Sequence, residues 1–183
     1  MADQKKMAEA VAAFLRAAGV TAEAETPERV ARAWAEDLLD GYARDPAAVL
    51  AQTIPAETSA DFVMVTGLRF HAICPHHLLP YRGVAHVAYV PAGRVVGFGQ
   101  LGQLVDALGH RLVLQEDLAR GIVDALGSGL GAAGAACALE AEQLCMTVRG
   151  DEQDRSKTYA EAFVGTLATD AALRARFVQR IGK

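Results

Sequence analysis

The chain has 183 residues and a mass of 19.3 kDa, enough for one compact domain with a sizeable core. Hydrophobic residues make up 52% and charged residues 22%, a balance typical of a folded globular protein and not of a disordered one. The 18 basic and 22 acidic residues give a net charge of −4, without a basic cluster, which argues against nucleic acids and acidic membranes as partners.

Neither the apolar runs nor the cysteines indicate export or membrane insertion. No run approaches the roughly 18 uninterrupted apolar residues of a membrane helix, and the short apolar run near the start lacks a signal-peptide cleavage pattern. Three cysteines are too few for a disulfide framework. We therefore expect a soluble cytoplasmic protein with no membrane partner.

The first part of the chain predicts helices. Residues 6–18 are rich in alanine, with apolar residues at helical spacing. A second helix is expected to have Thr26 as its N-cap and Pro27 at its first position. Asp45 and Pro46 then break the chain, and a short helical turn is expected after them.

The remainder of the chain alternates β-type and helical patterns. The predicted strands, rich in valine, alanine and aromatic residues, span residues 62–70, 84–90, 135–150 and 158–165. The predicted helices span residues 100–109, 112–130 and 171–181. This order predicts an α+β fold, and the exposed edges of its sheet favour assembly into a ring.

Two cysteines and a histidine form a candidate metal site. Cys74 and His77 have a Cys-x2-His spacing just after a predicted strand, and Cys145 lies in a downstream strand. Thiolate and imidazole are ligands that zinc favours, and three protein ligands leave a fourth position open for water. The alternative for a cysteine is burial as a small apolar side chain, which we expect for Cys137.

His76, next to the predicted zinc ligand, is a candidate proton shuttle. Neighbouring residues of an extended segment point in opposite directions, so His76 faces a substrate if His77 faces the metal. An imidazole exchanges protons near neutral pH. The alternative is a surface histidine. We expect His71, His86 and His110 to be structural.

Four segments, in this order and spacing, resemble GTP cyclohydrolase I: TPERVARAW, CPHHLLPYRGVAHVAYVP, RLVLQEDL and CMTVRG. The resemblance extends over residues 26–165. It implies a tunnelling fold, in which two helices pack on an antiparallel sheet and oligomerisation completes the barrels. It also implies a homo-oligomer, usually a decameric ring, with active sites between subunits. We accordingly expect an N-terminal helical region, residues 1–55, and a tunnelling-fold catalytic region, residues 56–183, within one domain.

The resemblance implies a zinc-dependent ring opening. In that family, water bound to zinc attacks C8 of the guanine of GTP, formate is released, and a pterin ring is closed. The positions that match the family's zinc ligands are Cys74, His77 and Cys145.

Further matches concern the purine. His76 matches the family's proton donor, and Gln115 with Glu116 matches the pair that recognises the guanine edge. A carboxylate accepts paired hydrogen bonds from the N–H and amino groups of guanine, so it rejects bases that lack these donors.

Other positions depart from the family pattern. Gln143 stands where the family has a catalytic histidine; its amide forms hydrogen bonds but cannot shuttle a proton. Pro75 stands where the family has glutamate. Ser156 and Thr158 match part of a Ser/Thr run and are either pocket residues or ordinary strand residues.

The positions that match the family's triphosphate-binding residues differ most from the family pattern. Gly99, Gln100 and Gln103 replace a serine, a lysine and an arginine, and Thr66 aligns with another arginine. Arg149 alone matches a retained arginine, and we keep it with Gln100 and Gln103 as candidate substrate contacts. At roughly 1.5–3 kcal/mol for each charged hydrogen bond, losing three cations removes on the order of 5 kcal/mol of binding energy. GTP would then be a poor substrate.

These observations predict a zinc hydrolase that opens the imidazole ring of a guanine-like purine without a triphosphate, a base or a nucleoside, and that need not form a pterin. One alternative is an ordinary GTP cyclohydrolase I whose missing cations come from Arg69, Arg111, Arg155 or Lys157. Others are a non-catalytic zinc-binding homologue and a related nitrile reductase, although a nitrile reductase needs a metal-free cysteine.

Overall fold

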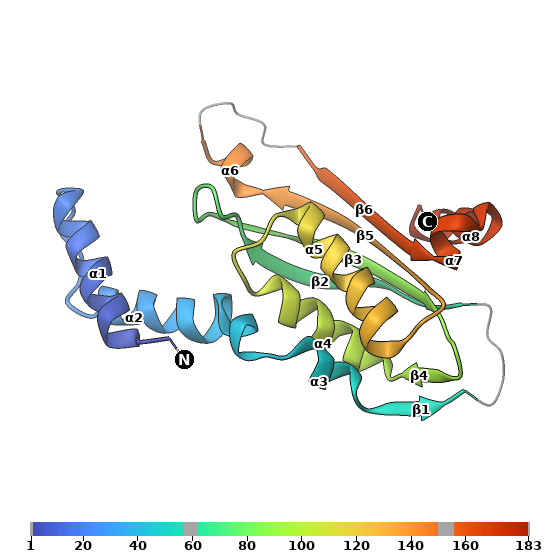
Figure 1. Ribbon diagram of the computed structural model, residues 1–183. Helices are drawn as coiled ribbons and strands as arrows, with labels where there is room; N and C mark the ends of the chain where they lie inside the picture. The colour runs from blue at the N-terminus through green and yellow to red at the C-terminus, as the bar shows by residue number, and fades with distance from the viewer. Residues whose placement is uncertain (1, 57–61, 150–155, 183) are drawn as a thin grey trace.

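The computed structural model describes residues 2–56, 62–149 and 156–182. Figure 1 shows a twisted sheet at the centre, helices covering one of its faces, and the N-terminal helices extending to one side. Among the described helices, none has the length and apolar character that a bilayer crossing demands.

The central sheet has four antiparallel strands in the order β2-β3-β5-β6. These strands are β2 (Val63–Ile73), β3 (Pro80–Val90), β5 (Gly134–Gln143) and β6 (Thr158–Gly165). A separate two-stranded sheet pairs β1 (Thr53–Pro55) with β4 (Arg94–Val96), which the sequence did not predict. Within the described residues β2 and β6 are free edges, so the main sheet is open and no barrel closes.

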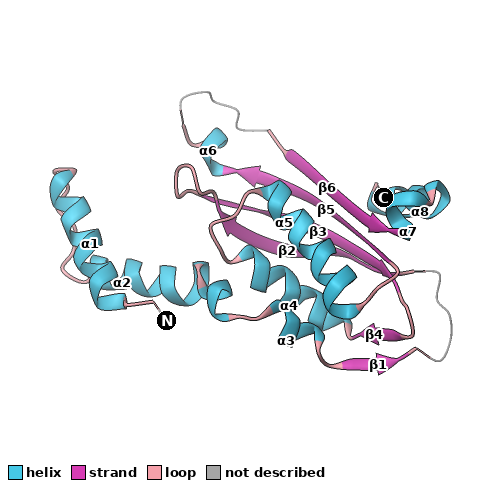
Figure 2. Ribbon diagram, in the orientation of Figure 1, coloured by secondary structure: helices cyan, strands magenta, loops and turns pink. Residues whose placement is uncertain are grey.

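Two helices cover one face of the main sheet (Figure 2): α4 (Phe98–Gly109) packs on β2, and α5 (Gln115–Asp124) packs on β5 and β6. Side chains that alternate along β3, such as Ala85, Val87 and Tyr89, are fully buried beneath them. The predicted α+β fold, with two helices on an antiparallel sheet, is confirmed.

The C-terminal helices α7 (Thr166–Thr169) and α8 (Ala171–Ile181) cover part of the opposite face. Phe177 of α8 is completely buried there against the sheet residues Ala136 and Ala138. The rest of this face carries charged side chains from neighbouring strands.

The N-terminal region is helical, as predicted. It contains α1 (Gln4–Ala17), α2 (Thr26–Ala33), a π-helical turn (Trp34–Leu38), a 3-10 turn (Asp40–Ala43) and α3 (Pro46–Leu50). The prediction that Thr26 is an N-cap is wrong by one residue, because α2 begins at Thr26 with Glu25 before it.

One polar contact network attaches this region to α4. His110 Nδ1 lies 2.7 Å from Asp40 Oδ1, and Arg111 donates to the carbonyl oxygens of Gly41 and Arg44 at 2.9 and 3.1 Å. Burial alone would raise the pKa of Asp40, but hydrogen bonds from His110 and Arg44 hold it below its usual value.

The structure corrects two predicted boundaries near the candidate site. The predicted strand 135–150 ends at Gln143 and is followed by α6 (Leu144–Thr147), a single helical turn. Gln143 pairs with Tyr81 at the start of β3, so beyond it β5 has no neighbour on that side. The helix predicted for residues 112–130 begins only at Gln115, because Val113 first donates to the carbonyl of Ile73, at the end of β2.

Candidate metal centre and adjoining cavity

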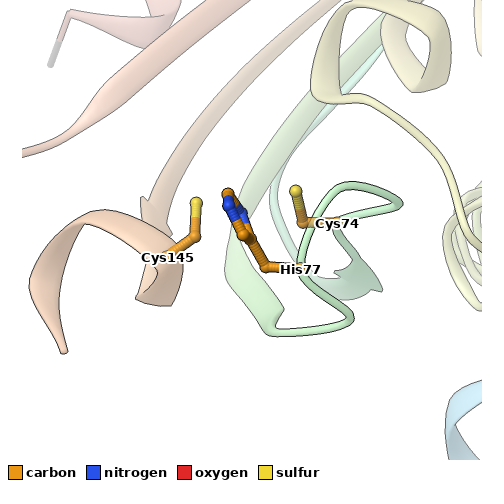
Figure 3. A group of neighbouring side chains, drawn as sticks. All are labelled: Cys74, His77 and Cys145. Carbon is orange, nitrogen blue, oxygen red and sulfur yellow. The ribbon is translucent and has the colours of Figure 1, made fainter. Parts of the chain in front are cut away.

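The ligand atoms of Cys74, His77 and Cys145 all lie within 4.8 Å of one another. Figure 3 shows the three side chains turned toward one another, the first two from the turn after β2 and the third from α6. Two sulfurs and one imidazole nitrogen at this spacing suit a zinc ion and leave one tetrahedral position open. Cys74 is buried and His77 is exposed, so the cluster lies at the edge of the core, where solvent reaches it.

A tight turn between β2 and β3 positions Cys74 and His77. The Leu78 amide donates to the Cys74 carbonyl, and the Cys74 amide donates to the Leu79 carbonyl, each at 2.9 Å. Leu78 has a φ of 55°, the left-handed conformation, which is uncommon for a leucine. The expectation that His76 and His77 lie on an extended segment is wrong, because residues 75–77 form this turn.

The two histidines still differ in their surroundings. His77 joins Cys74 and Cys145, whereas His76 lines the adjoining cavity with its Nδ1 3.9 Å from Cys74 Sγ. Their ring centroids lie 6.3 Å apart. The turn therefore places one imidazole in the cluster and the other on the wall of the cavity.

The environment of Cys145 explains how a metal would bind. Burial raises the pKa of the Cys145 thiol, the nearby Cys74 raises it further, and Arg149 opposes the rise. A metal ion would therefore displace thiol protons on binding. Cys137 is completely buried in β5, outside the cluster, and burial raises its pKa as well. Its expected role as a small apolar core residue is confirmed.

A cavity of about 230 Å³ adjoins the cluster. Its lining includes Cys74, Cys145, His76, Glu116 and Gln143, so the structure brings these predicted site residues together. Among the described residues that line it, none is a lysine or an arginine.

Gln115 also borders the cavity, but the residue is only 4% exposed. Gln143 Nε2 donates to Gln115 Oε1 at 2.9 Å, so these predicted substrate and catalytic residues contact each other. Glu116, the next residue of α5, is exposed, and its carboxylate has no hydrogen bond or ion pair with the residues that the structure describes.

Gln100 lies in the first turn of α4 and Gln103 near its middle, and neither lines this cavity. Gln100 accepts from the Gly97 amide at 2.8 Å and donates to the carbonyls of Val49 and Gln52 at 2.7 and 2.9 Å. Gln100 thus caps its own helix and holds the end of α3. Gln103 is exposed, and Arg149, also exposed, follows α6.

The candidate replacement cations lie elsewhere or already have partners. Arg111 binds the N-terminal region and Lys157 forms an ion pair with Glu140. Arg69 is exposed on β2 and lines a different depression, and Arg155 lies outside the described residues.

The remaining histidines, His71, His86 and His110, have the surroundings expected of structural residues. His71 stacks on His110 with ring centroids 4.0 Å apart, at the attachment of the N-terminal region. His86 is half-buried in β3, and burial lowers its pKa.

Sequence reasoning missed Tyr81, a buried residue of the cavity wall. Its hydroxyl donates to the Val113 carbonyl at 3.0 Å, and this contact places the segment that leads into α5. The signal was present, because Tyr81 precedes Ala85, Val87 and Tyr89 on the buried face of β3.

Comparison with known proteins agrees with this geometry. The sequence pattern described as GTP cyclohydrolase I matches residues 7–182. The chain is 40% identical to GTP cyclohydrolase 1 of Chromobacterium violaceum, covering 94% of this chain and 85% of that protein. It is 38% identical to GTP cyclohydrolase 1 of Listeria welshimeri, covering 98% and 96%.

A solved structure described as the archaeosine synthase QueF-Like in the apo form shares 17% identity, with a TM-score of 0.48 over 59% of this chain. That likeness is too weak to bear on function. The match over residues 7–182 and the identities to the two bacterial proteins decide the assignment. The chain belongs to the GTP cyclohydrolase I family, whose members are hydrolases that act on carbon–nitrogen bonds.

Proposed function

We propose that this chain is a zinc-dependent cyclohydrolase that opens the imidazole ring, by hydrolysis at C8, of a guanine-type purine base or nucleoside without a triphosphate. The reaction need not continue to a pterin. The observation that carries this proposal is the Cys74, His77 and Cys145 cluster, which borders a cavity containing Glu116 and, among its described lining, no lysine or arginine.

The cluster would hold the zinc ion. Two thiolates and one imidazole match the donor set of a catalytic zinc site. When bound there, zinc supplies Lewis acidity that lowers the pKa of water toward about 7. Cys74 and Cys145 contribute the negative charge that retains the ion, and the exposed side of His77 leaves the site open to solvent.

The cavity residues act on the purine. Glu116 accepts two hydrogen bonds, from the N1–H and the 2-amino group of guanine, which orients the base and rejects adenine. His76, on the turn beside the cluster, gives a proton to a ring nitrogen as the carbon–nitrogen bond breaks.

Charge disfavours a triphosphate. A triphosphate needs several charge-assisted contacts. Arg149 acts electrostatically on Cys145 but is not among the described residues that line the cavity, and Gln100 is committed to its own helix.

The proposal includes assembly into a homo-oligomeric, decameric ring with sites between subunits. It is supported by the open edges of β2 and β6 and by the described lining of the cavity, which includes no residue of α4 from the same chain. In such a ring, residues 56–183 form the catalytic region and residues 1–55 a helical extension. Free thiols at Cys74 and Cys145 support a reducing, cytoplasmic location.

The test is a comparison of substrates. Zinc-loaded protein is incubated with guanine, guanosine and GTP, and products are followed by ultraviolet absorbance, mass and released formate. We expect kcat/KM to be highest for guanine or guanosine. Efficient conversion of GTP to dihydroneopterin triphosphate, with guanosine untouched, would contradict the proposal.

GTP itself is the second candidate substrate. The specific observation in its favour is that relatives sharing 37–40% identity over most of this chain are described as GTP cyclohydrolase 1. In this case cations from a neighbouring copy would complete the triphosphate site. The same substrate comparison separates the two candidates.

A further inference from the structure

The carboxamide of Gln115 has no hydrogen-bonding capacity left for a ligand. A glutamine side chain has two N–H donors and one oxygen with two lone pairs. Gln115 Nε2 donates to the carbonyls of Leu139 and Thr158 at 3.1 and 3.2 Å. Gln115 Oε1 accepts from the Thr158 hydroxyl at 2.6 Å and from Gln143 Nε2 at 2.9 Å.

The two carbonyls determine the polarity of this network. A carbonyl only accepts, so the NH₂ group of Gln115 must face β5 and β6, and its oxygen must face Thr158 and Gln143. Gln143 must then present its own NH₂ group to Gln115. The Thr158 hydroxyl also lies 3.2 Å from the Ala141 carbonyl, its alternative acceptor.

This network anchors the start of α5. Gln115 is the first residue of that helix, and the N-cap position, Leu114, offers no side-chain hydrogen bond. Gln115 is buried beneath the helix, while the adjacent Glu116 is exposed and lines the cavity. The position of the Glu116 backbone therefore depends on the contacts of Gln115.

We propose that Thr158 and Gln143 are positioning residues that act through Gln115 to aim the Glu116 carboxylate at the guanine edge. This inference rests on the proposed function, because it assumes that Glu116 binds the base. It assigns Gln143 to substrate affinity and not to proton transfer, and it gives Thr158 a role in specificity. Loss of either contact should weaken binding of the base and leave the chemical step unchanged.

The test compares Thr158→Val with Thr158→Ser in the full-length, zinc-loaded protein. Valine keeps the shape and removes the hydroxyl, whereas serine keeps the hydroxyl. The equilibrium probe is 7-deazaguanosine, which keeps the guanine N1–H and 2-amino edge but lacks N7. We expect Thr158→Val to weaken its binding and to raise the KM for guanosine by about tenfold, the effect of one lost hydrogen bond at 1–1.5 kcal/mol. Zinc content and kcat should stay within twofold of the parent, and Thr158→Ser should restore binding.

A second variant and a double mutant test whether Thr158 and Gln143 both act through Gln115. Gln143→Met removes the second donor to Gln115 and should also raise KM alone. Because both variants act through one oxygen atom, Thr158→Val/Gln143→Met should weaken binding by less than the product of the single effects. Thr166→Val is the matched control, since it removes a buried hydroxyl without a described partner and should change neither KM nor kcat.

The outcomes separate this inference from the proposed function. If the parent protein neither binds 7-deazaguanosine nor opens guanosine, the proposed function fails. If the parent does both and Thr158→Val binds the probe normally, the positioning role alone is wrong. A drop in kcat for Gln143→Met at unchanged KM would likewise overturn it and would restore Gln143 as a catalytic residue.

Discussion

The cavity beside the metal cluster and the start of α4 use similar polar residues in opposite ways. At the cavity, Glu116 and His76 are exposed and face a space that a ligand can enter. At the start of α4, the side chain of Gln100 forms hydrogen bonds with the backbone of Gly97, Val49 and Gln52 in its own chain. The difference teaches that a residue at a family substrate position need not remain a ligand contact, because its polar atoms can stabilise the fold instead.

The largest expected effect comes from breaking the cluster. Cys145→Ala removes one of three ligands, so zinc content should fall far below one per chain. Turnover of guanosine should drop by more than about a hundredfold, the upper range for loss of an outer-shell partner alone. Metal analysis and steady-state kinetics measure both. The matched control is Cys137→Ala, a buried cysteine outside the cluster, which should keep its zinc. Full activity of Cys145→Ala would refute the metal site.

The next effect tests the ligand-facing side of the cavity. Glu116→Gln keeps the size of the side chain but replaces one acceptor oxygen with a donor, which mismatches the guanine edge. We expect kcat/KM for guanosine to fall by about 10- to 100-fold, as for lost hydrogen bonds to a charged group. Asp117→Asn, the next exposed carboxylate on α5, is the control and should retain activity. An equal loss of kcat/KM in both variants would contradict a specific role for Glu116 in binding the base.

A smaller effect is expected from adding a positive charge to α4. It would test whether the missing cations account for a preference for guanosine over GTP. Gln103 is exposed, so Gln103→Arg should fold normally. In the proposed ring, its guanidinium would raise kcat/KM for GTP about tenfold, the lower value for one charged hydrogen bond, and leave guanosine unchanged. Gln103→Met is the uncharged control. An equal rise for guanosine would show that the gain does not come from phosphate contacts.

The smallest effect concerns the structural use of Gln100. Gln100→Ala removes the bond to the Gly97 amide and the bonds to Val49 and Gln52, so the free energy of unfolding should drop by about 2 kcal/mol. Thermal unfolding should shift down by roughly 4–8 °C. Zinc content should not change. Gln103→Ala on the same helix should shift the midpoint little, and a comparable drop there would argue against a specific role for Gln100.

Most of the helices and strands followed from local patterns, and the errors share a cause. The apolar run through Cys145 predicts a strand, but β5 ends at Gln143 because its neighbour β3 begins at Tyr81 and Pro80. The short strands β1 and β4 stabilise each other by pairing, and neither has a local signal strong enough to predict it. Strand ends are decided by the partner strand, which lies far away in the sequence.

The candidate site likewise has residues that the sequence identified and residues that only the structure revealed. Residue type and spacing pointed to Cys74 and His77, since thiolate and imidazole are ligands that zinc favours. The part played by Thr158 could not be read from the sequence, because its importance lies in a contact with Gln115 across 43 positions of chain.

The amino-acid sequence by itself determined the α+β composition, the donor set for a metal and the family to which this chain belongs. These properties depend on residue identity and local periodicity, which can be read along the chain. Only the tertiary structure decided which polar atoms remain available. In the folded chain, the amide of Gln115 is hydrogen-bonded to the sheet, Gln100 is hydrogen-bonded to α3, and Glu116 is exposed. The reason is that hydrogen-bond partners depend on which groups lie close together in the folded core.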